Sequence, residues 1–406
     1  MLAAIVTYTL GFATAALALA TIAFAIQAAA GIFPHDPSYV LSSRRPTIAV
    51  LIPAHNEEQD IEATLLRIKI HLTQNDRLLV VADNCTDATA AIAAAAGAEV
   101  LVRDEPSCCG KGFALAAGLR YLNASPPEVI VFIDADCEIS PHGVEVLARA
   151  CAAANAPLQC LDFMIPNPDR PAPPRLAEFA WRVRNDLRPR GYARLGLPYH
   201  LLGTGMALPW SMAEPELLAT GHLTEDKYFG LELAIKGYAP RFFPGVRVTS
   251  YFPDAQRAHV QQKQRWMHGH FGLMNSHLPR LLYHGLRRRD IGLLALAADL
   301  AVPPLGLLAV ANVALVVLCF SCMIGIGSTV PLGLAAIDMV LFSFPLATAW
   351  YLCGRDLIGM EEIKQVPRHV VMVLRSAVDL ARGHKTKWLR ADRSQASVRD
   401  THYTHR

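Results

Sequence analysis

Two long apolar blocks flank the middle of this chain, and they constrain its fold more than any other feature. Residues 1–34 contain no charged side chain, and residues 291–353 contain only Asp299 and Asp338. A helix needs about 20 apolar residues to cross a bilayer, so each block is long enough to do so. With 52% hydrophobic residues overall, the sequence predicts a membrane protein rather than an ordinary soluble one.

The first block lacks the basic start of a signal peptide and exceeds the usual length of its apolar region. We therefore expect residues 1–33 to be a retained transmembrane anchor, although a removable signal peptide is the alternative. Residues 291–353 predict two more spanning helices, over about 303–325 and 331–353. Pro303 and Pro304 should kink or break the second helix.

Residues 291–302 should either lie at the membrane surface or lengthen the second spanning helix. A carboxylate is costly at the bilayer centre, which favours an interfacial position for Asp299. Basic clusters beside the blocks then predict the topology, because flanking Lys and Arg stay in the cytoplasm. Arg44–Arg45 and Arg287–Arg289 bracket the middle of the chain, which should be cytoplasmic with the N-terminus outside. The basic tail, residues 354–406, should also be cytoplasmic.

Strand-like and helix-like segments alternate in the middle of the chain, which we predict to be one domain over residues 45–285. Apolar, β-branched runs predict strands within residues 47–52, 77–83, 98–104 and 128–133. Helical periodicity follows in residues 61–72, 89–97 and 111–122. This order predicts the α/β class, with a mostly parallel sheet and helices on both faces. Such sheets bind ligands at the carboxyl ends of their strands.

Carboxylates and other polar side chains gather at these predicted strand ends. Asp134 and Asp136 follow the fourth strand, and side chains at i and i+2 of an extended chain point the same way. Hard oxygen ligands suit Mg²⁺ or Mn²⁺, and such a cation can bridge a diphosphate. A solvated turn is the alternative. His55–Glu57 and Asp83 fall at the ends of the first two strands.

Lys111 lies between Gly110 and Gly112 at a predicted helix start, where an anion is favoured. A turn with a surface lysine is the alternative, and no Walker A sequence is present. Two adjacent acids, Glu225 and Asp226, open another helix-like run. Thr224 could cap that helix, and acids in the first turn complement its dipole, so these residues alone do not require catalysis.

The segment Gln262-x-x-Arg265-Trp266 places its polar side chains on neighbouring helical turns. A guanidinium suits a phosphate, and an indole suits a sugar face or an apolar chain. Packing of this helix on a membrane-proximal core is the alternative. The net charge of +3 and the absence of a basic patch interleaved with aromatics argue against nucleic acid. The nine cysteines lack metal-ligand spacing and are expected to be free thiols.

The order of five short segments gives the chain a family resemblance. PAHNE (53–57), ADNCTD (82–87), DAD (134–136), TED (224–226) and QKQRW (262–266) together resemble the inverting nucleotide-sugar glycosyltransferases of family 2. The chain looks most similar to the membrane-bound branch related to cellulose, chitin and hyaluronan synthases. The resemblance covers about residues 46–275 and implies the GT-A fold.

The resemblance also implies roles for individual residues. Asp226 would be the general base, tuned by Glu225, and Asp136 with Asp134 would hold the divalent cation and the sugar diphosphate. Residues implied to bind the donor are Ala54, His55, Glu57, Asp83, Lys111, Asp134 and Arg265. Residues implied near the acceptor are Trp266, Gly203 and Thr204. Relatives often carry Tyr in place of His55 and Asp-Asp in place of Ala82-Asp83, so uridine as the nucleoside is an expectation only.

The implied function is sugar transfer from a nucleotide-sugar to a lipid-linked or saccharide acceptor, in exopolysaccharide or envelope synthesis at the bacterial inner membrane. A polysaccharide-assembly machinery is an expected partner. Gln262-x-x-Arg265-Trp266 resembles processive β-glycan synthases, but three spans are few to enclose a polymer channel, so we favour single transfer. An inactive membrane scaffold with the same fold is a remote alternative.

Overall fold

An eight-stranded sheet forms the centre of the computed structural model, which describes residues 1–33, 39–166, 175–252 and 256–381. Its strands are β1 (Ile48–Ala54), β2 (Arg77–Asp83), β3 (Glu99–Arg103), β4 (Val129–Phe132), β5 (Glu138–Ile139), β6 (Leu158–Ile165), β7 (Met206–Pro209) and β8 (Arg241–Tyr251). Their order is β3-β2-β1-β4-β7-β6-β8-β5. The first four strands are parallel, and β7 joins them to β6 through two antiparallel pairings. The predicted mostly parallel sheet is confirmed.

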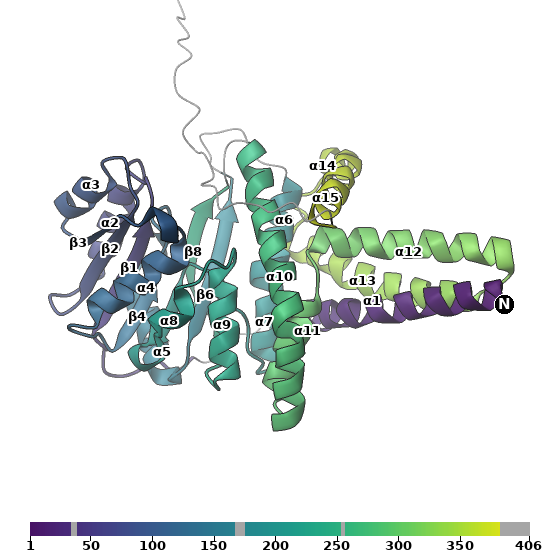
Figure 1. Cartoon of the computed structure of the whole chain (residues 1–406), viewed down its shortest axis with the longest axis horizontal. Helices are drawn as coiled ribbons and strands as arrows, with labels where there is room; N and C mark the ends of the chain where they lie inside the picture. The colour runs from purple at the N-terminus through teal and green to yellow at the C-terminus, as the bar shows by residue number, and fades with distance from the viewer. Residues whose placement is uncertain (34–38, 167–174, 253–255, 382–406) are drawn as a thin grey trace, which may run out of the picture.

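Helices cover both faces of the sheet, as predicted (Figure 1). On one face lie α2 (Ile61–Lys69), α3 (Thr89–Ala95) and α5 (Gly143–Ala154); on the other lie α4 (Lys111–Leu122), α8 (Pro215–Leu218) and α9 (Glu225–Ile235). Alternating residues of β1 explain the two layers. Val50 packs with the first set of helices, and Leu51 packs with the second. Both side chains are fully buried.

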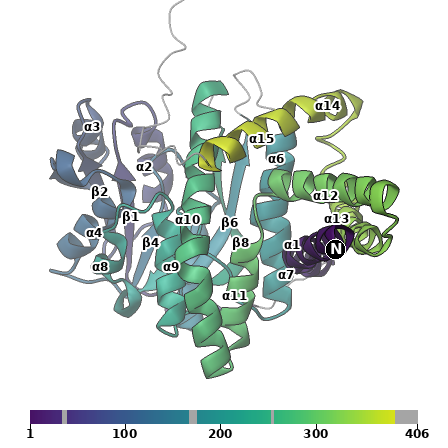
Figure 2. The ribbon, with the colours of Figure 1, turned by 45° about the vertical axis from the view of Figure 1, so that its right-hand side comes forward.

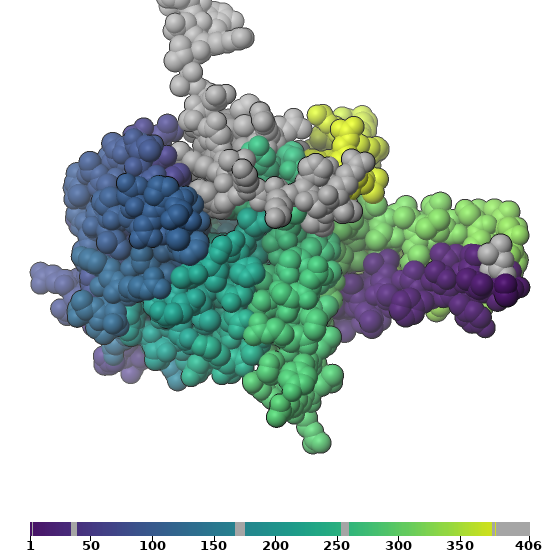
Figure 3. All heavy atoms as spheres, in the orientation of Figure 1, coloured from purple at the N-terminus to yellow at the C-terminus, as the bar shows by residue number. Residues whose placement is uncertain are grey.

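Three apolar helices project together from this body as a rod (Figures 1 and 3). They are α1 (Leu2–Ile32), α12 (Leu305–Ile326) and α13 (Val330–Cys353). By length and composition, each could cross a membrane. Large apolar side chains such as Phe12, Leu318 and Phe344 are exposed on them, as expected for surfaces that face lipid. The predicted break at Pro303–Pro304 is present, because α11 (Ile291–Ala301) ends before it and α12 begins after it.

The remaining helices lie within the body or between it and this rod. They are η1 (Pro106–Cys108), α6 (Arg175–Arg182), the π-helix η2 (Val183–Leu187), α7 (Arg188–Arg194), η3 (Trp210–Met212), α10 (Gln256–Arg288), α14 (Met360–Lys364) and α15 (Val366–Ala381). The long helix α10 lies between the sheet and the rod, and α14 and α15 lie beside the base of α12 (Figure 2). Most of the predicted tail, residues 382–406, falls outside the described residues.

A buried polar cluster joins α1, α7 and α11 around Asp299. That carboxylate is only 3% exposed and lies among protein groups, and its expected depth at the membrane interface stays a prediction. Arg188 forms an ion pair with it, His200 Nε2 lies 2.6 Å away, and Gln27 Nε2 donates to it at 2.9 Å. These partners, distant in sequence, compensate the buried charge of Asp299.

Candidate active site

A cleft of about 600 Å³ opens at the carboxyl ends of β1, β2 and β4. It brings together every site residue expected from the sequence. These are Ala54, His55, Glu57, Asp83, Lys111, Asp134, Asp136, Gly203, Thr204, Glu225, Asp226, Arg265 and Trp266. The parallel strands explain the convergence of the first half of this set, because their carboxyl ends meet at one edge. Helices α9 and α10 supply Glu225, Asp226, Arg265 and Trp266.

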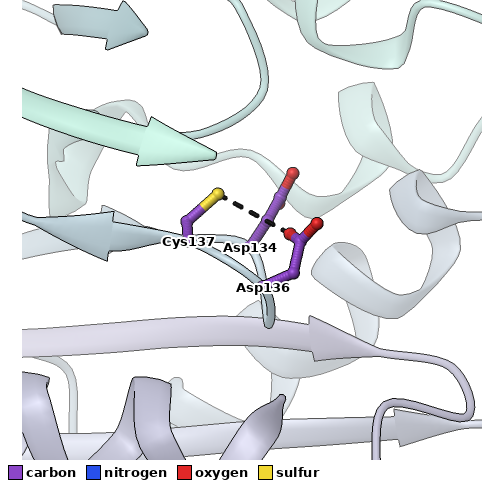
Figure 4. Close-up of side chains that lie close together, drawn as sticks. All are labelled: Asp134, Asp136 and Cys137. Carbon is purple, nitrogen blue, oxygen red and sulfur yellow. Dashed lines mark hydrogen bonds between the residues drawn. The ribbon is translucent and has the colours of Figure 1, made fainter. Parts of the chain in front are cut away.

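The loop after β4 holds a cluster suited to a cation. One ligand atom from each of Asp134, Asp136 and Cys137 lies within 4.8 Å of the others (Figure 4). Burial, followed by the charges of Asp136 and Asp134, raises the pKa of the Cys137 thiol well above its ordinary value. The thiol therefore stays protonated and donates a hydrogen bond to Asp136 at 3.6 Å. The two carboxylates remain as hard oxygen ligands that fit Mg²⁺ or Mn²⁺.

Lys111 connects this acidic pair to the opposite wall of the cleft. Its Nζ lies 2.6 Å from Asp134 Oδ1 and donates to the carbonyl of Gly203 at 2.9 Å. Burial opposes its charge, but Asp134 and Glu225 outweigh burial and raise the pKa of the ammonium. Lys111 is therefore a permanent cation at the start of α4, facing the acids of α9.

The loop before β7 approaches this cation so closely that only glycine fits. Gly203 has φ +96°, and a Cβ there would lie 3.1 Å from Lys111 Nζ and 3.2 Å from Asp226 Oδ2. The next residue, Thr204, accepts a hydrogen bond from the Asp134 N–H at 3.2 Å. Gly203 and Thr204, two of the three residues expected near an acceptor, thus lie between the acidic pair and Asp226.

Glu225 and Asp226 open α9 inside the cleft. The expected cap is wrong, because the Thr224 side chain makes no capping hydrogen bond and its Oγ1 is buried without a partner in the part of the chain that is described. Helix α10 crowds it there, since a Cβ on Gly269 would lie 2.7 Å from that oxygen. Burial, and then the neighbouring charge of Asp226, raises the pKa of Glu225 to about 7, against the influence of Lys111.

The polar side chains at the ends of β1 and β2 line one wall of the cleft and are already paired with protein groups. His55 Nδ1 lies 2.7 Å from the backbone carbonyl of Asp83, and the Asp83 carboxylate forms an ion pair with Arg103. The N–H of Glu57 donates to Thr89 Oγ1 at 2.7 Å, at the start of α3. Ala54 ends β1 in the same wall and is buried.

The cleft residues that sequence reasoning missed include Cys137, Asp162 and Trp181. Trp181 packs against Trp266 with ring centroids 5.3 Å apart, so two indoles line one side. Asp162 accepts a hydrogen bond from Asn185 Nδ2 at 3.0 Å. Burial and the charge of Asp134 raise its pKa to about 8. A single acid within the apolar run 158–165 was the available signal for Asp162.

Comparisons with known proteins agree with this architecture. The model of glycosyltransferase-like family 2 matches residues 46–269, more than half of the chain. Glucosyl-3-phosphoglycerate synthase of Mycobacterium tuberculosis is 39% identical over 102 residues, or 24% of this chain and 30% of that protein. An uncharacterized glycosyltransferase of Mycobacterium bovis is 40% identical over 89 residues, or 22% of this chain and 36% of that protein. The chain thus spans about a third of the length of these curated relatives.

The structure is also similar to the mannosyltransferase of Pyrobaculum calidifontis, solved in complex with GDP-mannose and Mn²⁺. The match has a TM-score of 0.54 and 15% identity, and it covers 93% of this chain and 99% of that one. At this identity the match supports the fold alone, a GT-A body followed by helices. The family match over residues 46–269 shows that the chain belongs to glycosyltransferase-like family 2.

Proposed function

We propose that this protein is a membrane-bound, inverting glycosyltransferase that moves a sugar from a nucleotide-sugar, which we expect to be a UDP-sugar, to an acceptor hydroxyl. The supporting observation is the arrangement around Lys111 and Gly203. Asp134 lies on one side of them and Asp226 lies on the other, in one cleft. A leaving diphosphate and an attacking hydroxyl need such opposed sites.

In this proposal, Asp134 and Asp136 hold a divalent cation, Mg²⁺ or Mn²⁺, on the sugar diphosphate. When bound, the cation supplies positive charge for the departing diphosphate. Lys111 and Arg265 add further positive charge from the protein, and both line the cleft. The wall formed by Ala54, His55, Glu57 and Asp83 would receive the nucleoside.

Asp226 would remove the proton of the acceptor hydroxyl as that oxygen attacks the anomeric carbon. The bond to the diphosphate breaks on the opposite face, so the anomeric configuration inverts. Glu225 would tune this base through its adjacent charge. Trp266, Gly203 and Thr204 would border the acceptor.

The apolar rod suggests an acceptor that is linked to lipid or held at a membrane. We place the catalytic body in the cytoplasm at the bacterial inner membrane, with α1, α12 and α13 as three spans, in exopolysaccharide or envelope glycan synthesis. Assembly with other polysaccharide-synthesis proteins fits this role. Tags at each end of the chain, tested for protease access in intact spheroplasts, check the topology. Access at the N-terminus and protection at the C-terminus are the expected results.

A screen of nucleotide-sugars with purified full-length protein, Mn²⁺ and a bacterial lipid extract tests the function, with products read by mass spectrometry. We expect one added sugar. A ladder of products would instead favour the processive synthase, for which Gln262, Arg265 and Trp266 provide the supporting motif. Absence of both transfer and donor hydrolysis with every nucleotide-sugar would favour the inactive scaffold.

A further inference from the structure

A second, smaller cavity of about 50 Å³ lies beside the cleft, and we call it the side cavity. It is lined by Asp162, Trp181, Arg184, Asn185, Leu201, Leu202, Thr224, Asp226, Lys227, Trp266 and His270. Asp226, Trp181 and Trp266 line the main cleft as well, so the two spaces meet at the proposed base. A buried water needs about 10–15 Å³ of such volume. The side cavity therefore has room for a small polyatomic group.

Two cationic side chains line the side cavity without an anionic partner. Lys227 is 8% exposed, yet its ammonium has no hydrogen bond or ion pair within the described residues. The Arg184 guanidinium likewise has none in the described ranges, and it lies over the Trp181 ring, 5.7 Å from the ring centroid. Lys227 is buried and Arg184 is partly buried. Because buried charges are normally paired, two such cations at one cavity require an explanation.

The acids of the side cavity do not supply the missing partners. Asp162 and Asp226 form no ion pair with either cation among the described residues, and Asp162 is instead bonded to Asn185. Burial and then the charge of Asp134 raise the pKa of Asp162 to about 8, against the charges of Arg184 and Lys111, which favours the protonated acid. His270 is also neutral, because burial and then Lys227 hold its pKa well below the ordinary value.

Lys227 remains mostly charged at neutral pH. Burial lowers the pKa of its ammonium to about 8, and the positive charges of Arg184 and Arg188 act in the same direction, whereas Asp299 opposes them. Among the groups that line the side cavity, two cations therefore stand against the carboxylate of Asp226, while Asp299 acts on Lys227 from outside it. The net charge of the side cavity is positive, and its occupant should be negative.

We propose that the side cavity binds an anionic group of the acceptor, a phosphate or a carboxylate, through Arg184 and Lys227. This inference rests on the proposed function, and it names a chemical class of acceptor. Arg184 would engage two oxygens of the group, and Lys227 would engage one. Binding there would hold a neighbouring hydroxyl at Asp226, which borders both spaces. The two positions would be specificity determinants rather than catalytic residues.

The first experiment measures anion binding by calorimetry on full-length protein in detergent, with UDP and Mg²⁺ saturating the donor site. Sulfate stands in for a phosphate group, and acetate stands in for a carboxylate. We expect one of them to bind, and Arg184→Gln and Lys227→Met each to weaken it by about ten-fold or more. The stronger of the two anions identifies the acceptor group.

Two control variants remove a positive charge nearby but outside the side cavity. Arg190 forms an ion pair with Asp186 on the same helical stretch as Arg184, and Lys236 forms one with Glu214 at the end of α9. Arg190→Gln and Lys236→Met should leave anion affinity unchanged. Unchanged UDP affinity shows that each variant is folded, and Arg184→Lys should retain part of the anion affinity. Binding of neither anion, or equal losses in the controls, overturns the proposal.

The second experiment separates an acceptor-borne group from a free anion. Sulfate is added to the transfer assay while the concentration of lipid extract is varied. We expect inhibition that excess extract relieves, with Arg184→Gln and Lys227→Met raising the half-saturating extract concentration more than they lower the maximal rate. Inhibition that extract does not relieve, or activation, overturns the acceptor assignment. Absence of transfer with any donor, alongside intact cavity-dependent sulfate binding, would refute the proposed function alone.

Discussion

Charged side chains form ion pairs in one half of the cleft but lack such partners in the other half, within the part of the chain that is described. In the proposed donor half, formed by the ends of β1, β2 and β4, Asp83 pairs with Arg103, and Asp134 pairs with Lys111. In the proposed acceptor half, formed by η2, α9 and α10, Arg184 and Lys227 have no such partner among the described residues. A paired wall is preorganised for one constant ligand. Unpaired charges can form ion pairs when the second substrate binds, and the free energy of that pairing then contributes to its binding.

The largest expected effect comes from the donor half. Asp136→Ala should abolish transfer, with a loss of at least about 10³-fold in kcat/KM, because it removes a cation ligand that stabilises the leaving diphosphate. It should also remove most of the response to Mn²⁺ concentration. Initial rates across a Mn²⁺ titration measure both effects, and near-normal turnover with an unchanged response would contradict the cation site.

Asp226→Asn tests the proposed general base, which lies where the two halves of the cleft meet. It should lower kcat by about 10²–10⁴-fold while leaving nucleotide affinity nearly intact, because Asn keeps the size of Asp but cannot accept a proton. Glu225→Gln is the matched variant and should be milder. Transfer rates and calorimetric UDP affinity for both variants settle the comparison. If Glu225→Gln is inactive and Asp226→Asn is active, then Glu225 rather than Asp226 is the general base.

Gly203→Ala should have an intermediate effect. The added methyl would push against Lys111 and Asp226 at once, and φ +96° strains any non-glycine residue. Displacing two reacting groups by a fraction of an ångström should cost about 10–100-fold in kcat. Gly221→Ala is a control on a nearby exposed loop, since a Cβ there meets nothing within 4 Å. Equal rates for the two variants would show that the close approach is unimportant.

The smallest effect concerns stability. Because Asp162 has its pKa raised from about 4 to about 8 by burial, the folded state binds an extra proton between those pH values. Stability should therefore fall as pH rises through this window, by up to about 1.4 kcal/mol per pH unit. Asp162→Asn should remove this pH dependence of stability. In thermal unfolding scans from pH 5 to pH 9, the Tm of the variant should therefore rise relative to that of the wild type as pH rises.

A matched donor-half variant sharpens this result. Asp83→Asn removes one of the two carboxylates that pair with Arg103, so it should lower the Tm across the whole pH range. A wild-type Tm that does not fall between pH 5 and pH 8 would contradict the assignment of Asp162 as a buried, protonated acid.

The sequence was most informative where local pattern and topology coincide. Apolar runs followed by acids predicted the parallel strands and the edge at which Asp83, Asp134 and Asp136 meet. The family assignment was confirmed as well. The structure brings all the expected site residues into one cleft, whereas their individual roles remain proposals.

Features that depend on distant packing were not predictable. Asp162 is one acid in an apolar strand. Its contact with the cleft depends on η2, which lies twenty residues further along the chain. The π-helical turn of η2 has no clear sequence signal. The Thr224 cap failed because α10 packs against that hydroxyl. For Asp299, the sequence indicated only that a charge near lipid is costly. Its partners Arg188, His200 and Gln27 come from three separate segments.

The cluster around Asp299 has a practical consequence for anyone who wishes to cut the molecule. Removing residues 1–33 deletes Gln27, and removing everything after residue 290 deletes Asp299. Either cut removes a buried partner of Arg188, a hydrogen-bond acceptor in the first case and its ion-pair partner in the second. Loss of a buried ion-pair partner typically costs about 3–5 kcal/mol. Such a loss is a large fraction of the stability of an ordinary domain. Helices α1 and α11 are therefore structural parts of the enzyme, and a soluble catalytic fragment should be made by redesigning this junction rather than by truncation.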